Sequence, residues 1–160
     1  MPEVIVNTSP LQYLHQLALM DLLPKLFGRS TVTQSVLTEL AQGRRLGLDL
    51  PFPETLPWID VRQPSSPAGG LLASDLGAGE SATLALALER PGSWAVLDDR
   101  LARQAAVALR VPLLGTAGIL LRAKRASHLP SVAPALAQLA ALGFRLKPAT
   151  RRAILRLAGE

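Results

Sequence analysis

The stretch VIVNTSP, residues 4–10, begins with three β-branched residues, which are followed by Asn7, two hydroxyl residues and Pro10. β-branched residues favour strands, and proline after a hydroxyl residue is typical of the first position of a helix. We therefore predict a strand over 3–7 and a helix from Pro10, with Ser9 as its N-cap. Asn7 lies between them, where it either contributes to a site or only closes the turn.

Four further segments share this short, aliphatic pattern and are predicted strands: RSTVT (29–33), WIDVR (58–62), WAVLD (94–98) and VPLLG (111–115). Helical periodicity predicts helices over 10–27 with a break near Pro24, 34–43, 78–90, 100–109, 117–126, 131–142 and 148–158. Loops are predicted at 43–57 and 63–70. This alternation indicates an α/β fold, a three-layer α/β/α sandwich with a mainly parallel five-stranded sheet.

The 160-residue chain contains no cysteine and two histidines, His15 and His128. Thiolate or imidazole zinc sites and cysteine nucleophiles are therefore excluded, and a bound metal has to be a hard cation held by oxygen. The apolar runs are far shorter than the roughly 20 residues of a membrane helix, and the N-terminus does not resemble a secretion signal. We expect a cytoplasmic protein without a membrane segment.

The net charge of +5 is unevenly distributed. Residues 1–99 hold 11 of the 12 acidic and 6 of the 17 basic residues, giving −5, whereas residues 100–160 hold 11 basic residues and 1 acidic residue, giving +10. A basic surface beside an acidic site suits a metal-dependent enzyme acting on a polyanion, because cations attract phosphate while carboxylates hold the metal. The alternative is that the arginine-rich helices are simply solvated.

Polar residues follow two of the predicted strands: Asn7 ends the first, and Asp98 and Asp99 end the fourth. Ligands of parallel sheets bind beyond the carboxyl ends of the strands, so we expect these residues at the same sheet edge. Adjacent carboxylates repel each other unless a positive charge, such as a divalent cation, lies near them. Alternatively, one of the two caps the helix that begins at Arg100.

Two glutamates and one threonine are further candidates. Glu80 opens ESATLALALE, a helix so apolar that burial is predicted. Its carboxylate either binds a metal or interacts with the helix N-terminus, which is worth about 0.3 to 1 kcal/mol. Glu39 borders an apolar stripe and by position alone is an ordinary surface residue, while Thr116 is predicted to cap the helix that follows it.

The chain resembles a prokaryotic branch of the PIN-like proteins, nearly from end to end. The resemblance rests on VIVNTSPLQYLHQLALMDLL, VTQSVLTEL, LGAGESATLALAL, AVLDDRLARQAA and LLGTAGILLRAKRASHLPSV, followed by ALGFRL. It implies a single PIN-like domain over 1–160 and a site at one sheet edge that binds Mg²⁺ or Mn²⁺ and cleaves RNA. It also implies a role as the toxin of a toxin–antitoxin pair.

The site of that family maps onto positions of this chain. The resemblance implies catalytic roles for Asn7, Glu39, Glu80 and Asp99, metal ligation by Asn7, Glu80, Asp98 and Asp99, and a supporting role for Thr116. The chain departs from the family at residue 7, where the family has aspartate. An amide oxygen can ligate a hard cation but brings no negative charge, so we expect weaker metal affinity.

Arg100 and Arg103 are the predicted nucleic-acid contacts, on charge alone. RNA, a small antitoxin protein and a second copy of the chain are the candidate partners. One alternative function is a catalytically impaired PIN-like regulator that binds RNA or protein, because Asn7 replaces the usual aspartate. Another is a phosphate-accepting regulatory domain, which is disfavoured because its acid pair would follow the first strand instead of the fourth.

Overall fold

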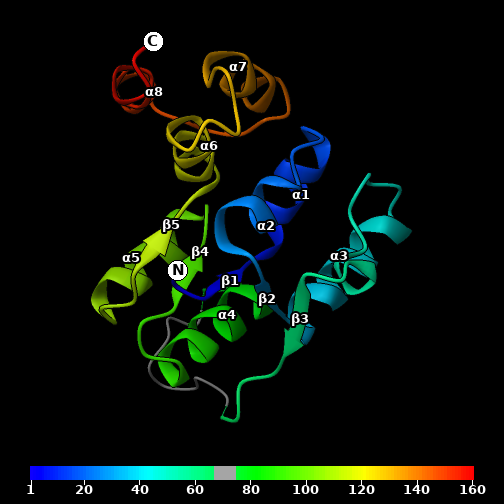
Figure 1. The fold of residues 1–160 in the computed structure, drawn as a ribbon. Coiled ribbons are helices and arrows are strands. Elements are labelled where there is room, and N and C mark those ends of the chain that lie inside the picture. The colour runs from blue at the N-terminus through cyan, green and yellow to red at the C-terminus, as the bar shows by residue number, and fades with distance from the viewer. Residues whose placement is uncertain (67–74) are drawn as a thin grey trace.

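The computed structural model describes residues 1–66 and 75–160 (Figure 1). The strands are β1 (Val4–Val6), β2 (Ser30–Thr33), β3 (Ile59–Arg62), β4 (Trp94–Val96) and β5 (Leu113–Leu114). The helices are α1 (Thr8–Gln16), α2 (Leu22–Phe27), α3 (Gln34–Arg45), the 3₁₀ turn η1 (Pro53–Thr55), α4 (Ala78–Glu89), α5 (Arg100–Ala108), α6 (Thr116–Arg125), α7 (Ala133–Ala141) and α8 (Pro148–Leu157). None of these helices has the length and apolar character needed to cross a membrane.

The five strands form one sheet in the order β3-β2-β1-β4-β5, and every neighbouring pair is parallel. The predicted five-stranded sheet is confirmed, and it is entirely parallel. β1 is central and pairs with both β2 and β4, so the strand order reverses beside it. Such a reversal opens a crevice at the carboxyl ends of the strands, where ligands of α/β sheets bind.

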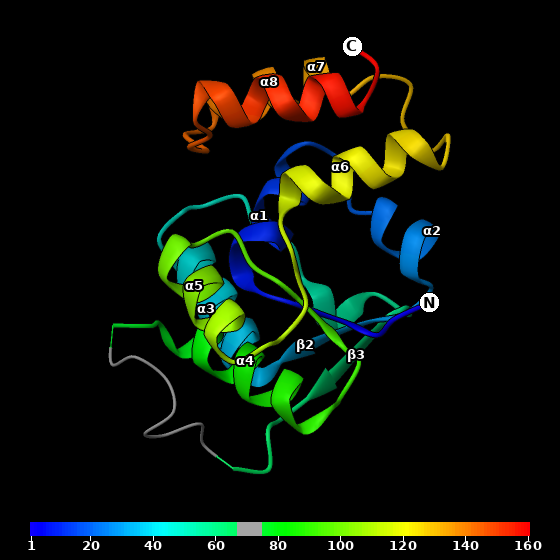
Figure 2. The same ribbon diagram turned by 90° about the vertical axis from the view of Figure 1, so that its left-hand side faces the viewer.

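The central strand β1 is buried on both faces, as expected of a parallel sheet covered by helices. Val4 and Val6 pack into a core with residues of α1, α2 and α6, whereas Ile5 packs into a second core with residues of α4 and α5. Successive side chains of a strand point to opposite faces, so VIV serves both cores. Figures 1 and 2 show the sheet between these two sets of helices.

Helices α7 and α8 lie beyond α6, on the side away from the sheet (Figures 1 and 2). The Glu160 carboxylate holds this layer together by accepting hydrogen bonds from the backbone N–H groups of Val132 (2.7 Å) and Ala133 (3.1 Å) and from Lys124 Nζ (3.2 Å). Ser131 Oγ also donates to it. These donors, the Ser131 hydroxyl foremost, lower the pKa of Glu160 to about 2.

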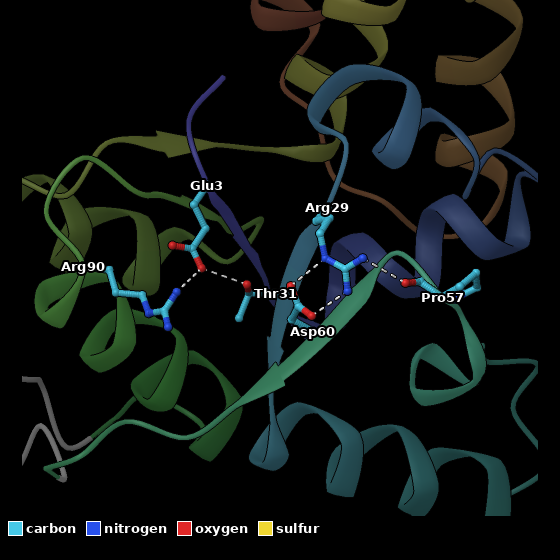
Figure 3. Close-up of polar contacts among 6 residues, drawn as sticks. All are labelled: Glu3, Arg29, Thr31, Pro57, Asp60 and Arg90. Carbon is cyan, nitrogen blue, oxygen red and sulfur yellow. Dashed lines mark hydrogen bonds and ion pairs between the residues drawn. The ribbon is translucent and has the colours of Figure 1, made fainter.

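Two polar clusters join the strands at their amino ends (Figure 3). Glu3 accepts hydrogen bonds from Thr31 Oγ1 (2.9 Å) and from Arg90, and so links β1, β2 and the end of α4. Arg29 donates to both carboxylate oxygens of Asp60 at 3.0 and 2.6 Å, linking β2 to β3. These contacts lie at the opposite edge of the sheet from the crevice beside β1, so their role is structural.

The predicted start of the first helix was wrong. The helix begins at Thr8, and Asn7 instead of Ser9 occupies the N-cap position. The predicted break of the helix over 10–27 near Pro24 was wrong in position: α1 ends at Gln16, Ala18 adopts a φ of 58°, and α2 begins at Leu22. Pro24 lies inside α2, in the first turn, where its missing N–H has no intrahelical acceptor to lose.

Two other local predictions need correction. Thr116 is the first residue of α6, and Gly115 holds the N-cap position that was predicted for Thr116. The predicted loop over 43–57 contains the end of α3 and η1. Of the loop predicted over 63–70, residues 67–70 lie outside the described part of the chain.

Candidate active site

Four of the predicted site residues lie in α3 and α4 or directly after β1 and β4, and Figure 1 shows the arrangement of these elements. Asn7 follows β1, and Asp99 follows β4, the parallel neighbour of β1. Glu39 is in α3, the helix that follows β2, and Glu80 is in the first turn of α4. The prediction that Asn7 and the acid pair share one sheet edge is confirmed by this topology.

Asn7 is buried, with 2% of its surface exposed. Its backbone N–H donates to the carbonyl of Val96 at 3.1 Å, which extends the pairing of β1 and β4. Its side chain makes no capping hydrogen bond to α1, and Oδ1 has no hydrogen-bond partner within the described residues. An unsatisfied buried acceptor costs about 1–3 kcal/mol, so closing the turn does not account for this side chain.

The Glu39 carboxylate is held from two sides. Thr8 Oγ1 donates to its Oε1 at 2.6 Å, and the N–H of Gly79 donates to its Oε2 at 3.3 Å. A Cβ atom at Gly79 would lie 2.1 Å from Glu39 Oε1 and 3.1 Å from Asn7 Oδ1. The carboxylate and the amide oxygen therefore share the space above the start of α4, and a side chain at position 79 would have to displace the Glu39 carboxylate.

The Glu80 carboxylate is half-buried, and its Oε2 accepts a hydrogen bond of 2.7 Å from the N–H of Gly77. Burial raises the pKa of Glu80 above its usual range, and the negative charges of Asp99 and Glu39 raise it further, while the Gly77 N–H opposes the rise. The predicted interaction with the helix N-terminus is thus present. Glu80 is therefore also close enough to Asp99 and Glu39 to be affected by their charges.

The two adjacent aspartates have different surroundings. Asp99 is exposed and caps α5, because its Oδ2 accepts a hydrogen bond of 3.0 Å from the N–H of Ala102. Asp98 accepts from the N–H of Thr116 at 2.8 Å and from Thr116 Oγ1 at 2.6 Å. Burial raises the pKa of Asp98, and the Thr116 hydrogen bonds and the charge of Arg103 oppose this. Thr116 thus supports Asp98, and both carboxylate oxygens of Asp98 are engaged.

The two predicted nucleic-acid contacts also differ. Arg100 is exposed at the first position of α5. Arg103 is half-buried, and its Nη1 donates to the carbonyl of Leu97 at 2.9 Å. Arg103 is therefore partly committed to holding the end of β4, which leaves Arg100 as the more accessible of the two cations.

Sequence reasoning did not identify Thr8 or Gly79 as site residues. Thr8 follows Asn7 directly and was considered only as part of a turn, although its hydroxyl reaches Glu39 in α3. Gly79 lies in the sequence GAGE, which lacks the lysine and spacing of a phosphate loop. The available signal was a glycine immediately before a candidate acid, where close approach of another group requires a missing side chain.

The donors present fit a hard cation. Within residues 1–66 and 75–160, no three His, Cys, Asp or Glu side chains form a group that could hold a metal by themselves. The orphaned oxygen of Asn7, however, lies beside the Glu39 carboxylate, and Glu80 is near two further negative charges. A divalent cation would satisfy the amide oxygen and offset this repulsion. In such a site Asn7 would contribute an oxygen donor without a negative charge.

Comparison with known proteins supports the sequence resemblance. A family model described as a PIN domain matches residues 3–160, a range that includes all the site residues considered above. No curated protein and no solved structure matches the chain significantly. The family match agrees with the observed architecture, an α/β fold with a five-stranded parallel sheet flanked by helices.

Proposed function

Because the chain belongs to the PIN-domain family, we propose that it is a metal-dependent ribonuclease that hydrolyses RNA phosphodiester bonds at the cluster of Asn7, Glu39, Glu80 and Asp99. PIN domains are generally metal-dependent nucleases, which supports a hydrolase. The observation that carries the proposal is the buried Asn7 Oδ1, which has no hydrogen-bond partner in the described residues and lies beside Glu39. A buried acceptor without a donor calls for an explanation, and a cation supplies one.

In this proposal Asn7, Glu80 and Asp99 are the residues that would hold Mg²⁺ or Mn²⁺. When bound, such an ion would lower the pKa of a water molecule and would stabilise the negative charge that develops on the phosphate. Glu39, fixed by Thr8 and Gly79, orients the attacking water and accepts its proton as a general base. Asp98 accepts two hydrogen bonds from Thr116 and so ties the end of β4 to the start of α6.

RNA is the proposed substrate because of charge and family. The net charge of +10 on residues 100–160 favours a polyanion, and the preference for RNA follows the resemblance to PIN-like proteins. The toxin role, with a small antitoxin as partner, extends the proposal on the same resemblance. We also propose that the chain can pair with a second copy of itself as a homodimer.

A catalytically impaired regulator is the second candidate function. It is favoured by the neutral side chain at position 7 and by the finding that no three acids of the described residues form a metal group. Such a protein would bind RNA or a protein partner through the same fold without turnover. Cleavage and RNA binding therefore have to be measured separately.

The test is cleavage of an end-labelled single-stranded RNA by the wild type in Mg²⁺, in Mn²⁺ and in EDTA. We expect cleavage only with metal, and we expect Glu80→Gln to abolish it by removing a ligand charge. Glu54→Gln is the matched control, because Glu54 is an exposed acid in η1. Full activity of Glu80→Gln would reject the proposal. RNA binding without cleavage in either metal would favour the regulator.

A further inference from the structure

A groove of about 760 Å³ lies between α5 and β5 on one side and residues 144–154 on the other. Its floor is apolar, formed by Val107, Leu113 and Leu114 together with Phe144, Leu146 and Ile154. Figure 2 shows the start of α8 on the same side of the molecule as α5, which agrees with this placement. The groove therefore joins the C-terminal layer to the edge of the sheet.

The rim of this groove is strongly basic. Arg100, Arg103, Arg145 and Lys147 line it, and none of them forms an ion pair within the described parts of the chain. The one carboxylate among the lining residues is Asp98, which is engaged by Thr116. Unpaired cations around a recess create a positive potential that attracts polyanions.

The groove adjoins the proposed cleavage site. Asp98 and Arg100 line the groove, and Asp99, a proposed metal ligand, lies between them in the chain. A strand that lies in the groove thus passes beside Asp98 and Arg100, the two chain neighbours of Asp99. This continuity connects a basic surface on the C-terminal part with the acidic site of the N-terminal part.

We propose that this groove binds single-stranded RNA beside the cleavage site, with Arg145 and Lys147 contacting its phosphates. The identity of the polyanion rests on the proposed function. The apolar floor favours a single strand, because the bases of a single strand can be splayed against a protein surface while those of a duplex stay stacked inside. Arg145 and Lys147 are exposed, so their positive charges remain available to a backbone.

The test is fluorescence anisotropy with a short labelled single-stranded RNA in EDTA, where binding is measured without cleavage. Arg145→Gln/Lys147→Gln removes two phosphate contacts. This lowers the log–log salt slope by about 1.4, and the affinity falls roughly 25-fold at 0.1 M salt. Val107→Glu, which adds a negative charge to the floor at a side chain that is 67% exposed, should weaken binding as well.

The control is Arg45→Gln/Arg62→Gln, which removes the same charge from exposed residues of α3 and β3. Salt screens charges over about 10 Å at 0.1 M, so the control should keep nearly wild-type affinity. Circular dichroism checks that each variant is folded.

Equal affinity of the groove variants and the control would overturn the inference, and so would a wild type that binds no RNA. An acidic peptide as the true occupant of the groove would give the first of these results. Equal affinity for duplex RNA, with the same loss in the groove variants, would overturn the preference for a single strand. RNA binding that depends on the groove without any cleavage would leave this inference standing and refute the proposed nuclease.

Discussion

Thr116→Val tests whether the Thr116 hydroxyl stabilises the carboxylate of Asp98, the first acid of the pair after β4. Thr116 is fully buried, and its Oγ1 donates to Asp98 Oδ2 at 2.6 Å, while its N–H donates to Oδ1 at 2.8 Å. Valine has nearly the same volume, so the substitution removes the hydroxyl bond without opening a cavity. A hydrogen bond to a charged group contributes about 1.5–3 kcal/mol, and we expect the free energy of unfolding to fall by that amount.

The measurement is equilibrium unfolding in urea, followed by the fluorescence of Trp58 and Trp94. For a domain of this size, about 1.5–3 kcal/mol corresponds to a fall in Tm of roughly 3 to 12 °C. The midpoint should change while the slope of the unfolding free energy against urea concentration stays constant, because the folded structure is kept. Thr116→Ser, which retains the hydroxyl, is the control.

A double-mutant cycle makes this prediction specific to Asp98. In the Asp98→Asn background the acceptor is neutral, so Thr116→Val should cost only about 0.5–1.5 kcal/mol. The same cost with Asp98 and with Asp98→Asn would show that the hydroxyl does not stabilise the carboxylate. An equal loss in Thr116→Ser and Thr116→Val would refute the reasoning as well.

Two further predictions concern the site and the C-terminal layer. Gly79→Ala forces Glu39 away, because the new Cβ would lie 2.1 Å from Oε1. Calorimetric Mn²⁺ titration should show weaker binding, although alanine favours a helix by up to about 1 kcal/mol. Glu160→Gln should flatten the acid limb of the stability curve. The pKa of Glu160 lies at about 2 in the folded protein against an ordinary 4.5, so its stabilisation is present above the ordinary value and lost as the pH falls toward 2.

Control variants distinguish these specific effects from a general loss of folding stability. Ser81→Ala, in the same turn as Gly79, should leave Mn²⁺ binding unchanged, and unchanged Mn²⁺ affinity in Gly79→Ala would contradict the placement of Glu39. For Glu160, urea midpoints are compared across the pH series with those of Glu54→Gln. A difference in urea midpoint between the wild type and Glu160→Gln that stays constant down to pH 2 would show that the charge of Glu160 does not stabilise its contacts with Val132 and Ala133 at the start of α7.

The sheet could be predicted because its strands are short, aliphatic and bounded by polar or glycine residues. All five lie where the pattern placed them, with ends trimmed by one to three residues, as in Trp94–Val96 against a predicted 94–98. A break in the first helical region was predicted near Pro24, but its true position between Gln16 and Leu22 could not be predicted, because the apolar pattern continues through it. The chain turns there at Ala18, whose φ of 58° is uncommon for a residue other than glycine and is not indicated by the residue type.

The site was predicted only in outline. The topology puts Asn7 and the acid pair at one edge, but the resemblance was needed to select Glu39. The contacts that fix the site join residues far apart in sequence: Thr8 and Glu39 are separated by 31 positions, Gly79 and Glu39 by 40, and Thr116 and Asp98 by 18. No local pattern specifies such pairs, so the roles of Thr8 and Gly79 emerged only from the fold.

The central claim is that Asn7 is a neutral oxygen donor in a divalent metal site. The most direct measurement compares the wild type with Asn7→Asp by calorimetric Mn²⁺ and Mg²⁺ titration, followed by RNA cleavage at matched metal saturation. An opposite charge within a few ångströms typically changes the proton affinity of an ionisable group by about 10-fold to 1,000-fold. We expect an added carboxylate to strengthen the binding of a divalent cation to a similar extent. We therefore predict at least about tenfold tighter metal binding and faster cleavage for Asn7→Asp. Equal metal affinity and equal cleavage in the two proteins would contradict the account.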